Sequence, residues 1–112
     1  MSTADINKVQ QNAADAARLL RSIGNEHRLL VLCRLVVHTE LSVGQLHAQH
    51  AGISQSSLSQ HLARMREDGL LACRKEGHMV YYRIADEKVG MVMQALKRIY
   101  CEESLPDGAA ET

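Results

Sequence analysis

The sequence predicts a small, mainly α-helical domain of the α+β class, in which four helices are followed by a β-hairpin and a last helix. Apolar residues recur at intervals of three and four in the first, fourth and last of these helices, which is the periodicity of an amphipathic helix. Ser, Asn or Asp precedes each helix after the first, where these residues are preferred as caps. Two β-prone runs flank a Glu-Gly pair, which indicates a tight turn between two strands.

The first half of the chain contains three of the predicted helices. The first covers residues 6–23, where an apolar stripe runs along one side, and Gly24 ends it. The second, "EHRLLVLCRLVVH", begins after Asn25 and is apolar on more than one face, so we expect it at the centre of the core. The third begins at Ser42 in "LSVGQLHAQH" and is ended by Gly52.

The second half contains the fourth helix, the hairpin and the last helix. The fourth helix begins after Ser54, runs to about Asp68 and is ended by Gly69. The strands "LLACRK" and "HMVYYRI" flank the turn, whose glycine is its second residue, and Asp86 caps the last helix. A short helix, a tight turn and a polar-faced helix followed by a hairpin describe a winged helix-turn-helix.

The fourth helix has an unusual outer face. With Leu58, Leu62 and Met65 toward the core, its outward positions are mostly serine, glutamine and arginine. Serine is a mediocre helix former, but hydroxyl, amide and guanidinium groups pair with base edges and phosphates in the major groove. A serine-rich helix that is merely solvated is the alternative, and the basic tip of the hairpin favours DNA. The predicted DNA-binding residues are Ser54, Gln55, Ser56, Ser57, Ser59, Gln60, His61, Arg64, Arg74, Lys75 and His78.

Length and composition limit the other possibilities. The 112 residues suffice for one domain, which we expect over residues 1–105, with a flexible tail over residues 106–112. The formal net charge of zero counts against a nucleic-acid-binding protein, but basic residues outnumber acidic ones five to three between residues 55 and 83. We find no transmembrane or signal pattern, so we expect a cytoplasmic protein with no membrane partner. No acid–base constellation, phosphate loop or cofactor motif is evident, so we predict neither an enzyme nor a cofactor.

Three segments together carry a specific resemblance. "ELSVGQL", "ISQSSLSQHLARMREDGLL" and "CRKEGHMVYYRIAD" resemble the ArsR/SmtB family of small bacterial transcription regulators, and the resemblance extends from about Ala14 to Cys101. It implies a homodimer in which the first and last helices of each protomer pack together. Each protomer would present one recognition helix to a half-site of an inverted-repeat operator in double-stranded DNA.

The metal sites of the family are not expected in this chain. Its arsenic and cadmium sensors carry cysteines where this sequence has Ser42 and Gly44, and its zinc sensors use Asp and His pairs on the last helix, which here contains no histidine. His47 and His50 lie three positions apart and could share a metal, but solvated surface histidines are commoner and no third ligand is evident. We therefore predict no metal site.

Cys33 in the second helix and Cys101 near the end of the last match the BigR/SqrR/HlyU sub-group of the family. Either cysteine alone is more often a buried small apolar residue. The resemblance implies that the two thiols approach within one protomer. Reactive sulfur species or oxidants would then join them through a disulfide or polysulfide bridge, and the repressor would leave its operator.

The neighbours of these cysteines add two expectations. Arg34, Lys97 and Arg98 lie close in sequence to one or the other cysteine, so we expect local cations to favour the thiolate. Cys73 has no counterpart in the pair, and strand alternation allows it to face the core, so we expect a structural role.

Two alternatives to the thiol-based repressor stay open. One is a DNA regulator without a chemical inducer that acts as an anti-repressor. The other is a metal- or metalloid-responsive repressor that uses Cys33, Cys101 and a histidine. A thiol peroxidase or sulfur transferase would need a catalytic constellation that the sequence does not show.

Overall fold

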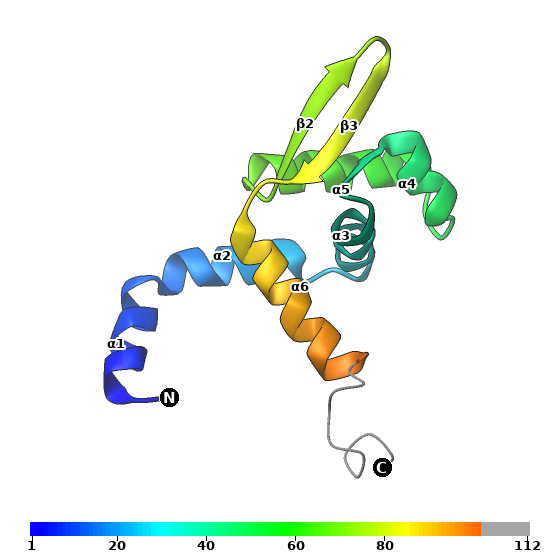
Figure 1. The fold of residues 1–112 in the computed structure, drawn as a ribbon. Coiled ribbons are helices and arrows are strands. Elements are labelled where there is room, and N and C mark those ends of the chain that lie inside the picture. The colour runs from blue at the N-terminus through cyan, green and yellow to red at the C-terminus, as the bar shows by residue number, and fades with distance from the viewer. Residues whose placement is uncertain (102–112) are drawn as a thin grey trace.

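The structure is a computed structural model that describes residues 1–101, so the tail predicted at residues 106–112 lies outside the described residues. Within this part of the chain, six helices and three strands follow one another (Figure 1). Their bounds are α1 Thr3–Gln11, α2 Ala13–Ile23, α3 Glu26–His38, β1 Glu40–Ser42, α4 Val43–Gln49, α5 Gln55–Glu67, β2 Leu71–Glu76, β3 Met79–Ile84 and α6 Glu87–Tyr100. The predicted winged helix-turn-helix is confirmed: α4 and α5 form the helix-turn-helix, and β2 and β3 form the wing.

The helix caps that the sequence predicts are present. The side chain of Asn25 accepts hydrogen bonds from the first backbone N–H groups of α3, and the side chain of Asp86 accepts one at the start of α6. Ser42 and Gln45 form a capping box at α4, and Ser54 caps α5. Each cap satisfies backbone donors that the helix itself leaves free, which fixes where these helices begin.

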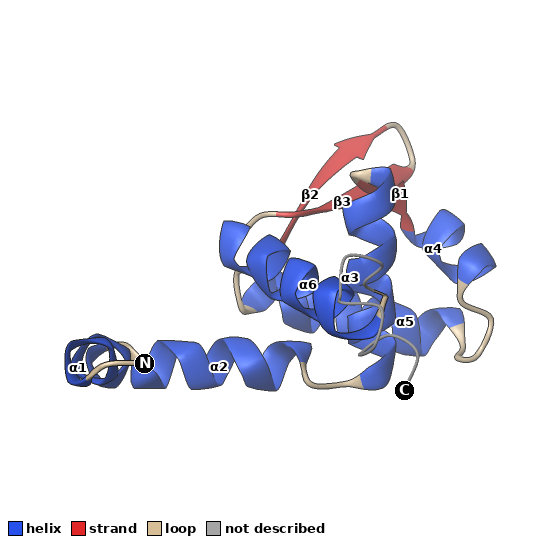
Figure 2. Cartoon of the chain, turned by 60° about the horizontal axis from the view of Figure 1, so that its bottom comes forward, coloured by secondary structure: helices blue, strands red, loops and turns tan. Residues whose placement is uncertain are grey.

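The sequence predicts a single helix over residues 6–23, and this is wrong in one respect, because the helix is interrupted at Asn12. Asn12 has φ −112° and ψ 12°, which is not helical, and its side-chain amide donates to the backbone oxygen of Lys8 at 2.9 Å. Asparagine competes with the helix for backbone hydrogen bonds in this way. As a result α1 and α2 run in different directions (Figures 1 and 2).

The sheet contains a strand that sequence reasoning missed. Residues Glu40–Ser42 form β1, which pairs antiparallel with β3, so the strand order is β1–β3–β2. Three residues are too few to show an alternating pattern, and the strand exists because the edge of β3 offers free backbone groups to pair with.

The hairpin turn lies one residue later than the sequence predicts. Glu76 pairs with Met79, so the loop consists of Gly77 and His78, with glycine first rather than second. Gly77 has φ +62°, a value that glycine adopts without steric cost. A two-residue loop with glycine first matches the right-handed twist of the strands that it joins.

Helix α3 lies at the centre of the core, as its apolar faces predict. It contacts α2, α5, α6 and two strands, and it buries Val31, Leu32 and Leu35. Leu58, Leu62 and Met65 of α5 are fully buried against it, whereas the opposite side of α5 is exposed. The core therefore fixes which face of α5 points outward. No helix within residues 1–101 has the length and hydropathy needed to cross a membrane.

Candidate functional site

The N-terminal half of α5 presents polar side chains on its exposed face. Ser54 accepts a hydrogen bond from the backbone N–H of Ser57 at 3.0 Å, and the two hydroxyl groups are 3.1 Å apart. These two serines therefore hold the start of the helix. The side chains free for outside partners are exposed and make no hydrogen bond to the residues that the structure describes; they are Gln55, Ser56, Ser59 and Gln60.

His61 is placed differently from the other predicted DNA contacts. It is half-buried, and its Nδ1 accepts a hydrogen bond of 3.0 Å from Nε of Arg28 on α3. It belongs to a group of three rings, which we call the histidine cluster: His27 of α3, His50 at the end of α4 and His61 of α5. His27 Nδ1 and His50 Nε2 lie 2.8 Å apart. This cluster joins both helices of the helix-turn-helix to α3.

Among the basic residues of the wing, Arg74 is paired with carboxylates, whereas Lys75 and His78 are exposed. The guanidinium of Arg74 donates two hydrogen bonds of 2.8 Å to Glu40 and another to Glu76, and it lies 4.6 Å from the ring centre of Tyr81. The bond from Arg74 holds the pKa of Glu40 below its usual range. Lys75 and His78 are exposed at the tip of the hairpin, and Arg64 is exposed at the other end of α5, 3.4 Å from Asp68.

Helix α6 packs against α3 (Figures 1 and 2), and the two predicted sensor cysteines lie on these two elements. Cys33 on α3 and Cys101 at the end of α6 line one groove of about 340 Å³, whose other walls are mainly apolar. We call this the cysteine groove. Both thiols are free and exposed in the single protomer. Both thiols are therefore accessible to a reagent that enters this groove.

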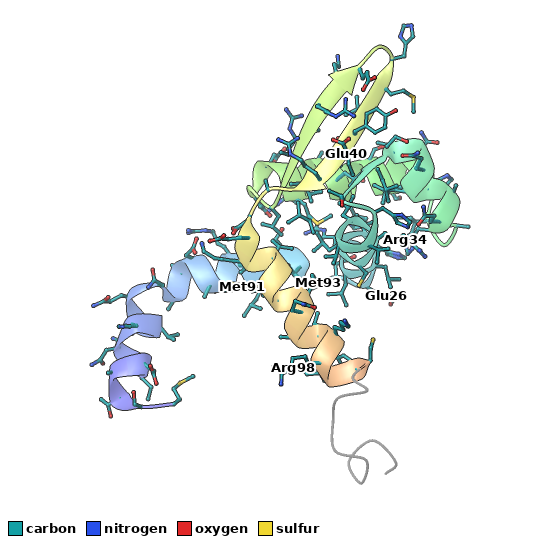
Figure 3. The ribbon with its side chains drawn as sticks, viewed as in Figure 1. Glu26, Arg34, Glu40, Met91, Met93 and Arg98 are labelled. Atoms are coloured by element: carbon teal, nitrogen blue, oxygen red, sulfur yellow. The ribbon has the colours of Figure 1, made fainter. Side chains whose placement is uncertain are left out.

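The expected activation of the thiols by neighbouring cations is wrong for Cys33. Although Cys33 is exposed, partial burial of its thiol raises the pKa, and a charge on Cys101 raises that pKa further, while Arg34 lowers it by less. The side chain of Arg34 points toward α4 (Figure 3), where it donates a hydrogen bond to Gln49 at 3.3 Å. Lys97, one of the cations that lie close to Cys101 in the sequence, also lines the cysteine groove.

Cys73 lies outside the cysteine groove. It is half-buried on β2 opposite Tyr82 of β3, whose pKa is raised by burial and by Cys73. Leu71, two residues earlier on the same face, is fully buried. Cys73 therefore sits at the edge of the core, and its structural role stays a prediction.

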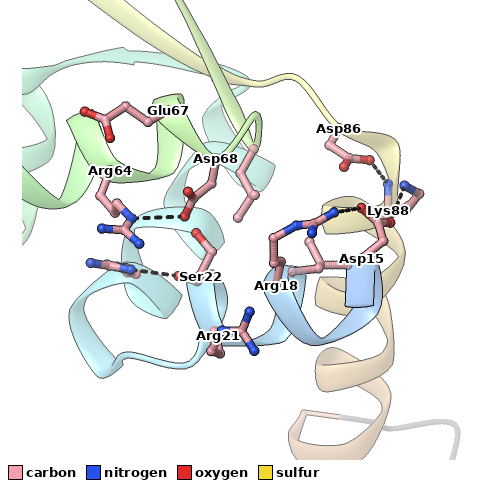
Figure 4. Close-up of a pocket in the computed structure, with 12 residues that line it drawn as sticks. Asp15, Arg18, Arg21, Ser22, Arg64, Glu67, Asp68, Asp86 and Lys88 are labelled. Atoms are coloured by element: carbon pink, nitrogen blue, oxygen red, sulfur yellow. Dashed lines mark hydrogen bonds and ion pairs between the residues drawn. The ribbon is translucent and has the colours of Figure 1, made fainter. Parts of the chain in front are cut away.

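A second cavity of about 400 Å³ lies between α2, α5 and the start of α6 (Figure 4). Some of its charged side chains pair with one another: Asp15 lies 3.4 Å from Arg18 and 3.3 Å from Lys88, and Arg64 pairs with Asp68. Such exposed pairs contribute little to stability. Ser22, whose buried hydroxyl has no partner within residues 1–101, completes the wall.

His47 and His50 do not share a site, although they lie one turn apart. A ring nitrogen of His47 lies 3.0 Å from the backbone oxygen of Ile53, whereas His50 bonds to His27. No group of three or more His, Cys, Asp or Glu side chains in the described range is arranged to hold a metal ion.

Comparison with known proteins identifies the family. Residues 25–72, from the cap of α3 to the start of β2, match the family described as bacterial regulatory protein, arsR family. The chain is 42% identical over 98 residues to the transcriptional activator HlyU of Vibrio cholerae, covering 88% of this chain and 89% of that protein. The chain belongs to the ArsR family. It is therefore a transcription regulator and not an enzyme, as the sequence predicts.

Solved structures of other ArsR-family regulators have the same fold. Reduced HlyU from Vibrio cholerae is 43% identical and superimposes with a TM-score of 0.76, covering 85% of this chain and 98% of that one. The transcriptional repressor BigR from Xylella fastidiosa is 35% identical with a TM-score of 0.78, covering 92% of this chain and all of that one. Because the similarity to BigR covers 92% of this chain, it extends over the helix-turn-helix, the wing and the helices that carry the two cysteines.

Sequence reasoning missed two residues of this ArsR-family protein that bind α4 and α5 to the core. His27 and Arg28 lie in the first turn of α3, where they read as solvated residues. Their partners His50 and His61 lie 23 and 33 positions further along the chain, and no spacing rule connects residues that far apart. A high content of histidine, six in 112 residues, was the only signal available.

Proposed function

We propose that this chain is a homodimeric repressor that binds an inverted-repeat operator in double-stranded DNA. Persulfide, polysulfide or an oxidant would release it by bridging Cys33 and Cys101. The observation that carries the proposal is the cysteine groove, which gathers two free thiols from helices that are far apart in the sequence. Because α3, which carries Cys33, packs against α5, and α6, which ends at Cys101, follows the wing, a bridge between them would act on the geometry of DNA binding.

The DNA-binding half of the proposal rests on the exposed face of α5 and the tip of the wing. Serine and glutamine side chains there are unpaired within the part of the chain that the structure describes, and they are suited to base edges and phosphates. Lys75 and His78 extend the same function to an adjacent groove or backbone. Arg74 contributes less than its charge suggests, because Glu40 and Glu76 already neutralise it.

The homodimer is supported by apolar side chains that the single protomer leaves in water. Ile6, Val9 and Leu20 of the N-terminal helices are more than half exposed, as are Met91 and Ile99 of α6. Exposed apolar side chains that recur along helices in this way are typical of contact sites in soluble proteins. Pairing the first and last helices of two protomers would cover these residues and set the distance between the two α5 helices.

The chemistry of the switch balances with persulfide as the only other reactant. One cysteine thiolate attacks the outer sulfur of a persulfide, RSSH, which gives a cysteine persulfide and releases RSH. The second thiol attacks the inner sulfur of that cysteine persulfide, a disulfide forms, and H₂S leaves. Two thiols are oxidised, and the sulfane sulfur is reduced to sulfide. The raised pKa of Cys33 favours its role as the second, resolving thiol.

The direct test joins mass measurement to DNA affinity. The reduced protein is treated with glutathione persulfide and, separately, with peroxide, and each sample is divided for intact-mass spectrometry and operator binding. We expect persulfide to give a bridge that maps to Cys33 and Cys101 and to weaken operator binding, while Cys73→Ser behaves as the parent chain. Unchanged operator affinity in a sample whose bridge is complete would contradict the proposal.

A second candidate is a DNA regulator without a chemical inducer, such as an anti-repressor. Two observations favour it: one relative is named an activator, and burial disfavours the thiolate of Cys33. Cys33→Ser separates the two functions, because only the thiol-based repressor loses its response. A metal- or metalloid-responsive repressor is the third candidate, and it predicts stoichiometric metal binding by the reduced protein without oxygen.

A further inference from the structure

The histidine cluster connects α3 to the two helices of the helix-turn-helix, and the proposed cysteine switch makes no use of it. The rings of His27 and His50 meet edge to face with their centres 5.1 Å apart, and those of His27 and His61 are 5.9 Å apart. One ring comes from each of α3, α4 and α5. The cluster therefore links the recognition helix and its partner helix to the centre of the core.

The hydrogen bonds of the cluster restrict its protonation. Only one proton fits between His27 Nδ1 and His50 Nε2 at 2.8 Å, so the bond breaks when both rings carry a charge. Nδ1 of His61 accepts from Arg28 at 3.0 Å, so it must be bare, and a proton there removes the acceptor. The observed arrangement thus requires a neutral His61 and at most one charge on the other pair.

The surroundings of His50 oppose its protonation. Its ring is only 8% exposed. Burial lowers the pKa of His50 most, the charges of His27, Arg34 and His47 lower it further, and only Glu26 acts in the opposite direction. One carboxylate therefore faces three basic side chains around this ring.

The groups around His61 all oppose its protonation. Burial lowers the pKa of its half-buried ring, and Arg28, His27 and His50 lower it further, with no carboxylate opposing them. The nearest basic group, Arg28, also donates to the backbone oxygen of Ser22 at 3.4 Å, which holds it in place beside the ring. Protonation of His61 would thus break its hydrogen bond from Arg28 and place two positive charges beside each other.

We propose that the histidine cluster makes operator binding respond to pH, so that acidification breaks its two hydrogen bonds, loosens α4 and α5 from α3 and weakens specific binding. Rings with a lowered pKa take up protons less readily in the ordered cluster than in a loosened one. The ordered form is therefore favoured above the ordinary histidine pKa of about 6.5 and loses that advantage as the pH falls below it. This inference rests on the DNA-binding half of the proposed function and is independent of the cysteines.

The test measures operator affinity of the reduced full chain by fluorescence anisotropy between about pH 7.5 and about pH 5.5 at constant ionic strength. We expect specific binding to weaken roughly three- to tenfold, since one pKa unit of coupling corresponds to a tenfold change. Binding to an unrelated duplex should not weaken, because added protons make the protein more positive. Failure to bind the operator at neutral pH would refute the proposed function instead, so the two failures are distinguishable.

Two variants assign the effect to the cluster. His50→Gln and His61→Gln keep a hydrogen-bonding side chain that does not titrate, and each should flatten the pH profile. His38→Gln, an exposed histidine at the end of α3, is the matched control and should keep the profile of the parent chain. NMR titration of the histidine rings in the parent chain gives a readout without substitution. A flat profile for the parent chain, an unchanged slope in both cluster variants, or rings of His50 and His61 that titrate outside the pH range of weakening would each overturn the inference.

Discussion

Arg74 on the wing donates two hydrogen bonds of 2.8 Å to the carboxylate of Glu40 on β1. The pair spans 34 positions of sequence and connects the strand before the helix-turn-helix to the strand that follows it. The sequence alone suggests that Arg74 is free to bind DNA, but its guanidinium is largely occupied by hydrogen bonds within the protein.

Lys75→Ala should reduce the salt dependence of operator binding more than Arg74→Ala does. Each phosphate contact contributes about 0.9 to the slope of log affinity against log salt concentration, and only Lys75 is free to make one. Removing the competing carboxylate by Glu40→Gln should increase the effect of Arg74→Ala. Binding titrations over a range of salt concentrations check this, and equal slopes for Lys75→Ala and Arg74→Ala would contradict it.

Leu62→Ala should mainly lower the stability of the fold, whereas Ser59→Ala should mainly weaken operator binding, although the two residues lie on the same helix. Leu62 is completely buried, and a Leu→Ala change at such a site costs about 2–5 kcal/mol of unfolding free energy. Ser59 is exposed, so its loss should change stability by less than about 0.5 kcal/mol while it weakens operator binding. Denaturant unfolding and operator titration on both variants decide the matter; a large loss of stability in Ser59→Ala would argue against its exposed placement.

Asn25→Ala should lower the unfolding free energy by about 0.5–2 kcal/mol. Its side chain accepts hydrogen bonds of 2.9 and 3.2 Å from the backbone N–H groups of His27 and Arg28, which also place both residues for the histidine cluster. Asn7→Ala, an exposed position within α1, serves as control and should be close to neutral. Thermal and denaturant unfolding measure the difference, and equal stabilities of the two variants would show that the cap does not form.

Cys33 should react with iodoacetamide more slowly at neutral pH than an ordinary cysteine. Burial and the neighbouring Cys101 raise its pKa, so the reactive thiolate appears only at higher pH. Cys101→Ser removes one of these causes and should therefore speed alkylation of Cys33. Cys73→Ser should have no such effect. Alkylation rates resolved by peptide mass spectrometry test the proximity of the two thiols, and a rate at Cys33 that ignores Cys101→Ser would speak against it.

The sequence alone determined most of the fold, because the deciding interactions are local. Helical periodicity, the caps Asn25, Ser42 and Ser54, and the glycine of the hairpin act within a few residues of where they stand. The buried face of α5 followed from the spacing of its apolar residues, and that spacing also fixed its polar face. The break at Asn12 was missed because its local hydrogen bond to Lys8 competes with a helical pattern that continues across it.

Tertiary structure alone decided the pairings between distant residues. The edge of β3 created β1, the carboxylate of Glu40 occupied Arg74, and helix packing placed His61 against Arg28 and Cys33 beside Cys101 in one groove. The sequence showed which of these side chains can react, ionise or form hydrogen bonds, but not which residue each one contacts. Burial then set the direction of their pKa shifts, because desolvation acts only once the chain has folded.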